Sequence, residues 1–294
     1  MGKAKPKRTW VEIDPNALRT NLYYAREQAE GADVMAVVKA DAYGHGFAET
    51  IKALDSEVSA FGVATLNEAL AVMSVTKKTT DIMILGALLP DEREDAVSAG
   101  LHVTISSLVE AKEYNKIGQR TSSRVKSHLV LDTGMGRLGF TEEDFISEVH
   151  QISSLQYIKI EGAATHFPCS DRDLEFTKNQ IKKFEAIIKE SKLKAQWIHL
   201  ANSAGIINFG NAGGNLIRPG LMLYGISPTN DPGHKLKPAM EWKARITQIR
   251  KLPPGSGISY GQTFVTDRNT LVATVAVGYG DGYPRSVSGN GAEV

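Results

Sequence analysis

Eight short apolar segments recur between residues 34 and 217, and each is bounded by glycine, proline, aspartate or serine. Apolar runs without polar alternation suit strands that are buried on both faces, as in parallel sheets. Helical patterns lie between the runs. Eight strands alternating with helices within about 230 residues predict a (β/α)8 TIM-like barrel, with an open doubly wound sheet as the alternative. The runs are residues 34–38, 60–64, 82–85, 102–105, 128–131, 158–164, 197–200 and 215–217.

Start signals for helices support this alternation. Asp14 precedes Pro15, which predicts an N-cap followed by the first helical residue. Residue pairs with the three-residue spacing of a capping box occur in the connections after three of the apolar runs. These pairs are Thr65 with Glu68, Ser107 with Glu110, and Thr141 with Asp144.

The pattern changes after the eighth run. Residues 228–238 (PTNDPGHKLKP) are polar and rich in turn-forming residues. Residues 239–247 then alternate between polar and apolar side chains with period two, and a second strand-like run follows at 271–277. We therefore expect an α/β barrel domain over residues 1–233 and a small β domain over residues 234–294.

The β domain is expected to be incomplete in this chain. Asn290-Gly291 is a hairpin signal, yet only three residues follow it. A strand that ends there would have no partner and would leave an open edge.

Composition and charge exclude several classes of protein. The formal net charge is +1, which gives no reason to expect binding to nucleic acid or to an anionic membrane. Cys169 is the single cysteine, so an internal disulfide is impossible. The N-terminus lacks the apolar region of a signal peptide, and no apolar run approaches a membrane span. We expect a cytoplasmic enzyme with a small-molecule substrate.

Polar residues follow the predicted strands at their carboxyl ends, where the active sites of such barrels lie. Each residue taken alone has an ordinary structural explanation: a strand-end lysine can extend to water, an arginine can form a surface ion pair, and Ser203 can cap the next helix. Their convergence on one rim favours a functional site. The residues are Lys39, Asp41, Tyr43, His45, Asp132, Arg137, His166, Asn202, Ser203, Arg218 and Gly220.

This set suits pyridoxal phosphate. Lysine forms Schiff bases with carbonyl compounds, and this cofactor requires such a lysine, a phosphate cradle and a partner for its ring nitrogen. The connections after the last two strands form the usual phosphate site of these barrels. Here they offer the Ser203 hydroxyl and the backbone N–H groups near Gly220 and Leu221.

Three other patterns have weaker claims. Residues 134–139 match G-x-G-x-x-G, but the predicted helix cap at Thr141 lies beyond the last glycine, which argues against a dinucleotide site. His166, Cys169 and Asp171 lack ordinary metal-ligand spacing, so no metal is expected. Glycines 278, 280 and 282 are interpreted as a turn.

The chain resembles the bacterial alanine racemases over nearly its whole length. The segments that carry the resemblance occur in the family's order, and together they are specific. They are VVKADAYGHG (37–46), DTGMGRLGF (132–140), THFPCSD (165–171), HLANSAG (199–205), IRPGLMLYG (217–225), ISYGQTF (258–264) and VGYGDGYPR (277–285).

The resemblance implies a role for each site residue. Lys39 would hold the cofactor covalently and act as one of two bases, and Tyr260 from a partner subunit would be the second base in a head-to-tail homodimer. Arg218 would hydrogen-bond the pyridine nitrogen, His166 would orient Arg218, and Arg137 would lie near the substrate carboxylate. The phosphate would be held by Tyr43, Ser203 and the backbone at Gly220 and Leu221, and Asn202 would also contact the cofactor. The product would be D-alanine for peptidoglycan.

One departure and several alternatives remain. Many family members carry a carbamylated lysine two residues before the DTGMGR motif, where this chain has Val130, so Arg137 needs another means of positioning. A barrel-type decarboxylase or aldolase would normally place a carboxylate at the pyridine nitrogen, which Arg218 opposes. A non-catalytic pyridoxal-phosphate carrier would not need Tyr260. A broad-specificity or serine racemase stays open.

Overall fold

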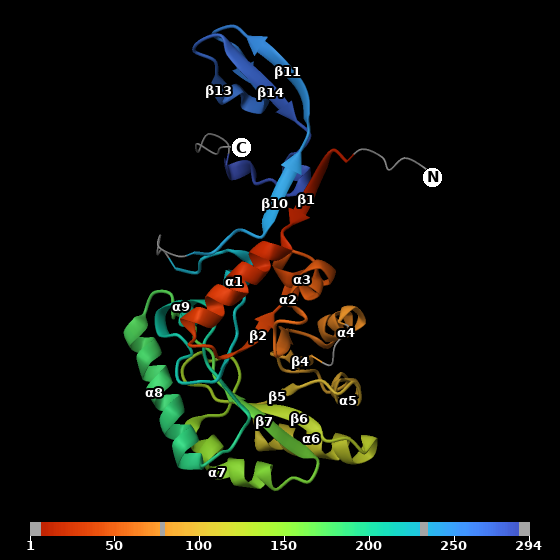
Figure 1. Cartoon of the computed structure of the whole chain (residues 1–294), viewed down its shortest axis with the longest axis vertical. Helices are drawn as coiled ribbons and strands as arrows, with labels where there is room; N and C mark the ends of the chain where they lie inside the picture. Colours follow the sequence, from red (N-terminus) through yellow and green to blue (C-terminus); the bar gives the residue numbers. More distant parts are fainter. Residues whose placement is uncertain (1–6, 77–79, 230–234, 288–294) are drawn as a thin grey trace. The chain divides into compact units, whose positions relative to one another are not determined.

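The computed structural model describes residues 7–76, 80–229 and 235–287. The chain forms two compact units: Asp14–Ala239 is one, and Met1–Ile13 together with Met240–Val294 is the other (Figure 1). The expected division at residue 233 placed the N-terminal segment in the barrel. The structure differs because β1 (Thr9–Ile13) pairs antiparallel with β10 (Met240–Ala244), from Thr9 opposite Ala244 to Ile13 opposite Met240.

All eight predicted runs form strands of the larger unit. Their burial is nearly complete along each strand, as expected for parallel strands that are covered on both faces. The strands are β2 (Asp33–Val37), β3 (Ala60–Val63), β4 (Asp81–Ile84), β5 (Val103–Ile105), β6 (Val125–Val130), β7 (Ile158–Ala164), β8 (Trp197–His199) and β9 (Leu216–Ile217).

The strands close into a barrel through two four-stranded parallel sheets, ordered β4-β3-β2-β9 and β5-β6-β7-β8. Backbone hydrogen bonds join the sheets at both seams. His102 donates to Ile82 O and accepts from Ile84 N, each at 2.9 Å, which links β4 to β5. Asn215 N donates to Ile198 O at 2.9 Å, which links β8 to β9. The barrel prediction is thus confirmed over the open sheet.

Helices follow the strands and cover the barrel (Figure 1). The predicted caps form: Asp14 accepts from Asn16 N, and the side chains of Thr65, Ser107 and Thr141 each accept from the N–H three residues later. The helices are α1 (Pro15–Gln28), α2 (Lys39–Tyr43), α3 (Phe47–Leu54), α4 (Leu66–Val75), α5 (Arg93–Ser98), α6 (Leu108–Thr121), α7 (Glu142–Ser153), α8 (Leu174–Ser191), α9 (Ser203–Phe209) and the 3-10 helix η1 (Leu221–Tyr224).

Helix α1 shows how sequence sets the packing. Its buried positions Leu18, Leu22 and Ala25 recur every three or four residues, so they form one apolar stripe. Asn21 lies on the same stripe and is also buried. Its amide donates to Leu223 O and Lys237 O and accepts from Lys237 N, at 2.8–2.9 Å, so the buried polar group is satisfied.

The smaller unit contains β11 (Ile246–Leu252), β12 (Gly257–Ile258), β13 (Phe264–Val265) and β14 (Thr270–Val275), with 3-10 turns η2 (Tyr260–Gln262), η3 (Tyr279–Asp281) and η4 (Arg285–Val287). Strand β11 pairs antiparallel with β14, and β12 with β13. The turn expected from the closely spaced glycines is confirmed, with Gly282 at φ 97° after η3. The Asn290-Gly291 hairpin signal lies outside the described residues. Among the described residues, no helix is long and apolar enough to cross a membrane.

Candidate active site

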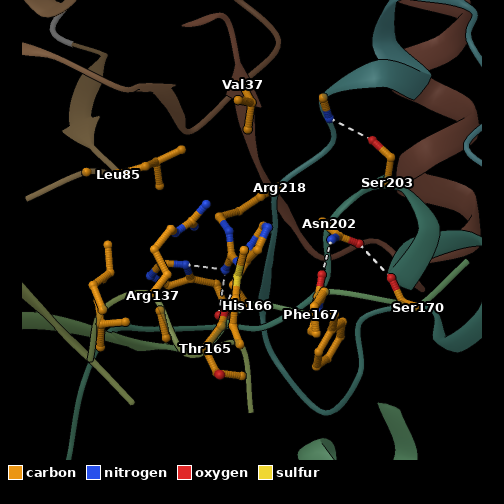
Figure 2. A pocket seen from close by; sticks show the side chains of 18 of the residues that line it. Val37, Leu85, Arg137, Thr165, His166, Phe167, Ser170, Asn202, Ser203 and Arg218 are labelled. Atoms are coloured by element: carbon orange, nitrogen blue, oxygen red, sulfur yellow. Dashed lines mark hydrogen bonds between the residues drawn. The ribbon is translucent and has the colours of Figure 1, made fainter. Parts of the chain in front are cut away.

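A pocket of about 690 Å³ opens at the carboxyl ends of the barrel strands. Nine of the ten predicted site residues line it, and Figure 2 shows Arg137, His166 and Arg218 side by side within it. Tyr260 is the tenth. It lies in η2 of the smaller unit, with 81% of its surface exposed. The nine residues are Lys39, Tyr43, Arg137, His166, Asn202, Ser203, Arg218, Gly220 and Leu221.

Lys39 begins an unusual turn. The four residues after it, from Ala40 to Tyr43, have φ between 51° and 55°, which is the left-handed region. Residues other than glycine adopt this left-handed conformation at a cost of roughly 1–2 kcal/mol each. Strain of this kind concentrates at functional sites, where the surrounding structure enforces it. No glycine marks this turn in the sequence, so it was not predicted.

Glu68 of α4 holds this turn against the barrel. One of its carboxylate oxygens accepts from Ala40 N at 2.8 Å, and the other accepts from Ala64 N at 2.7 Å, at the end of β3. Asp41 secures the other side of the turn by accepting from Phe47 N at 2.8 Å. These two carboxylates therefore fix the backbone that carries Lys39.

Arg218 is buried in the pocket floor with its terminal nitrogens fully occupied. Nη1 donates to the carbonyl and to Nδ1 of His199, at 2.6 and 2.7 Å. Nη2 donates to Thr165 O at 2.7 Å and to Leu200 O at 3.0 Å, and it lies 3.2 Å from His166 Nδ1. No partner of Nε is found among the described residues, so that N–H is the donor that the guanidinium keeps for a ligand.

Burial and the neighbouring Arg137 lower the pKa of Arg218 to about 10. The group still carries its charge at neutral pH. Burial lowers the pKa of His166 to about 3, and the cations Arg218, Arg137 and Lys39 act in the same direction. His166 is therefore a neutral imidazole whose Nδ1 faces Arg218 as an acceptor. The orienting role that the resemblance implies for it stays a prediction.

The Ser203 hydroxyl, the Gly220 backbone and the Tyr43 ring meet at one side of the pocket. Ser203 does not cap α9, because Asn202 takes this role by accepting from Gly205 N at 3.0 Å. The Ser203 hydroxyl instead accepts from Gly220 N at 2.9 Å (Figure 2). A Cβ added to Gly220 would lie 2.8 Å from the Tyr43 hydroxyl, so a side chain there would fill this space.

Asn202 lines the pocket, but its amide is used within the protein. It donates to Phe167 O at 2.9 Å and accepts from the Ser170 hydroxyl at 3.0 Å (Figure 2). It thereby ties the connection after β7 to the start of α9. The sequence placed Asn202 among the cofactor ligands, whereas its contacts in this structure position the loops around the pocket.

The glycine-rich segment does not offer a phosphate site. The Asp132 carboxylate accepts from the N–H groups of Gly134, Met135 and Gly136 at 2.8–3.1 Å. Burial raises the pKa of Asp132, but these three N–H groups outweigh it, so the pKa lies below its ordinary value. The backbone donors that a pyrophosphate would need are thus already bound to a carboxylate.

Arg137 extends from this segment into the pocket. Val130, which ends β6 and lines the same pocket, is buried and offers it no polar contact. Within the part of the chain that the structure describes, the Arg137 side chain has no hydrogen-bond or ion-pair partner. Its guanidinium is therefore available to an anionic group such as a carboxylate.

The residues beneath Arg218 were not predicted from the sequence. His199 ends β8 and contacts the guanidinium directly, and two further buried histidines follow it into the barrel. Inward and outward side chains alternate along a buried strand, and this pattern could have identified the three histidines as inward-facing. The apolar runs that contain them are too short to show which positions face inward. Within the described residues, no group of three or more His, Cys, Asp or Glu could hold a metal ion.

Fold and pocket together define an α/β-barrel enzyme whose cationic site lies at the carboxyl ends of its strands. The N-terminal domain of alanine racemases matches residues 13–228, and the C-terminal domain matches residues 239–294. Alanine racemase from Halothermothrix orenii is 37% identical over 299 aligned residues, which cover 99% of this chain and 79% of the relative. That from Carboxydothermus hydrogenoformans is 37% identical, covering 96% and 78%.

Solved structures agree. Alanine racemase of Clostridium difficile 630 superposes with a TM-score of 0.85 at 33% identity, covering 95% of this chain and 75% of that one. The enzyme from Streptomyces lavendulae gives a TM-score of 0.86 at 29% identity, covering 98% and 78%. The chain belongs to the alanine racemase family, whose members are isomerases.

Proposed function

We propose that this chain interconverts L- and D-alanine with pyridoxal phosphate as cofactor, and that it supplies D-alanine for peptidoglycan. The observation that carries the proposal is that one pocket brings together a lysine, an arginine with a free Nε–H, and a cradle of hydroxyl and backbone donors. The names of the relatives support alanine as the substrate.

The residues present fit the cofactor. Lys39 is the primary amine at the pocket that can bond covalently to its aldehyde. The Ser203 and Tyr43 hydroxyls and the Leu221 N–H would hold the phosphate, in the space that a side chain at Gly220 would fill, and the Gly220 N–H would support the Ser203 hydroxyl. Arg218 would donate from Nε to the ring nitrogen. Because this guanidinium keeps its proton at neutral pH, the ring nitrogen would stay unprotonated.

When bound, pyridoxal phosphate withdraws electrons from the substrate's Cα and so acidifies its proton. The protein must then move that proton on two faces. Lys39 would act on one face. We assign the opposite face to Tyr260 of a second copy in a head-to-tail homodimer, which accords with the high exposure of Tyr260 in its own chain. Arg137 would bind the substrate carboxylate.

Borohydride trapping tests the assignment of Lys39. After incubation with pyridoxal phosphate and borohydride, proteolysis and mass spectrometry should locate one cofactor-sized addition on the peptide that contains Lys39. Pyridoxine phosphate, which lacks the aldehyde, should add nothing and serves as the control. An addition confined to other lysines would contradict the proposal.

A further inference from the structure

Three buried histidines form a continuous column through the barrel interior beneath Arg218. His199 Nε2 lies 2.8 Å from His128 Nδ1, and His128 Nε2 lies 3.0 Å from His102 Nδ1. At the far end, His102 Nε2 lies 3.0 Å from Asp81 Oδ1, and Lys126 donates to that same oxygen at 2.8 Å. The column thus runs from Arg218, after β9, to Asp81, the first residue of β4.

The barrel is shaped around these rings. All three histidines are at most 2% exposed. The His128 ring stacks on Trp197 with centroids 5.8 Å apart and an interplanar angle of 22°. On another side it lies against Gly162 of β7, where a Cβ would come within 2.2 Å of His128 Nδ1. Three buried imidazoles are costly unless their nitrogens are paired, and the column pairs five of the six in series with each other and Arg218. The sixth, His102 Nε2, is close to Asp81 but is not aligned for a hydrogen bond.

The Arg218 end of the column sets its direction, and the charge of Asp81 at the other end favours the same direction. Arginine can only donate hydrogen bonds, and an ionised carboxylate can only accept them. A neutral imidazole has one donor nitrogen and one acceptor nitrogen. His199 Nδ1 must accept from Arg218, so His199 carries its proton on Nε2. The same requirement passes to His128 and then to His102, whose Nε2 proton faces Asp81.

The electrostatics are consistent with neutral rings at His128 and His199. Burial lowers the pKa of His128 to about 3, and the charge of Arg218 acts in the same direction. Burial also lowers the pKa of His199 well below its ordinary value, as does Arg218. Contact with His102 lowers the pKa of Asp81 far below its usual range, and Lys126 adds to this, so the carboxylate is ionised.

We propose that His199, His128 and His102 are positioning residues for Arg218, with the guanidinium setting the single direction of their hydrogen bonds and the charge of Asp81 favouring the Nε2 proton of His102. If His199 carried its proton on Nδ1, a donor would face the Arg218 donor at 2.7 Å and would force the guanidinium to turn. The column keeps Nη1 engaged and so leaves Nε directed to the pocket. The link to catalysis rests on the proposed function, whereas the column itself does not.

Nitrogen-15 NMR of histidine-labelled protein tests the column without cofactor or substrate. The three rings should each show a neutral Nε2–H tautomer at neutral pH. In Asp81→Asn, the signals of His102 and His128 should change. Asp33→Asn is the matched control, because Asp33 is likewise the first residue of a strand in the same sheet and contacts Ser59 outside the column. It should leave all three rings unchanged.

Two variants of His102 guard against misfolding of the aspartate variant. The amide oxygen of His102→Asn can replace Nδ1 as the acceptor for His128, whereas His102→Leu cannot. The tautomers of His128 and His199 should persist in the first variant and be lost in the second. In the cofactor-loaded enzyme, His102→Leu should lower kcat for alanine roughly tenfold, with little change in KM.

An imidazolium or an Nδ1–H tautomer at any of the three positions in the unaltered protein would overturn the proposal. So would wild-type ring signals at His128 and His199 in His102→Leu. These outcomes are separate from the proposed function: loss of the column signature with full racemisation refutes only the positioning role, and an intact column without racemisation refutes only the function.

Discussion

Replacement of Lys39 with alanine is expected to reduce alanine racemisation by roughly 10⁴-fold or more, because the change removes both the covalent link to the cofactor and one of the two bases. The assay is conversion of L-alanine to D-alanine, resolved by chiral chromatography, with pyridoxal phosphate in excess. Lys39 lines the pocket at the end of β2, so the substitution should not disturb the core.

Lys52→Ala provides the matched control. Lys52 is an exposed lysine of α3, and it lies 13 residues after Lys39 in the same connection between β2 and β3. Its replacement should leave the rate unchanged within about twofold, as expected for a surface position. Retention of a tenth or more of the activity in Lys39→Ala would contradict the assignment of this residue.

Replacement of Tyr260 with phenylalanine is expected to lower racemisation in both directions by roughly 10²–10⁴-fold, the usual contribution of a positioned acid or base. The change removes only the hydroxyl group of the side chain. Tyr23→Phe is the control. It removes an exposed hydroxyl that lies 3.1 Å from Glu57 in the larger unit, and it should leave the rate unaffected.

Mixing the two inactive variants tests whether Tyr260 acts in a second copy. In a mixed dimer, the site of the Tyr260→Phe chain would contain its own Lys39 and the Tyr260 of the partner subunit. An equal mixture that has exchanged subunits should therefore recover about a quarter of the wild-type rate, because half of the dimers are mixed and each has one complete site. A mixture that exchanges subunits, as seen by native mass spectrometry, yet stays inactive would contradict the shared site.

The local sequence was sufficient to predict the barrel. The eight apolar runs coincide with the eight strands, and the caps at Asp14, Thr65, Ser107 and Thr141 form as expected, because both signals depend on residues close in the chain. The pairing of β1 with β10 could not be predicted in this way. It joins segments more than 200 residues apart, and neither carries a local mark of its partner.

The same distinction between local signals and long-range contacts applies to the residues of the site. Side chains at strand ends, such as Lys39 and Arg218, could be placed on one rim because a parallel barrel brings all carboxyl ends together. The left-handed turn after Lys39 and the histidine column depend on contacts across the barrel, with Glu68 and with Asp81. The alternative role of Ser203 as a helix cap is excluded, because Asn202, one residue earlier, takes the Gly205 N–H.

The activity that we propose is two-base racemisation of alanine, and deuterium exchange at the alanine Cα is its most direct test. The protein, loaded with pyridoxal phosphate, is incubated with L-alanine in D₂O while the Cα proton signal and the optical rotation are followed together. We predict that both decay together to zero. Loss of the proton signal with the rotation retained would mean that one base works on one face, and no change in either would mean that alanine is not the substrate; each of these results would contradict the account.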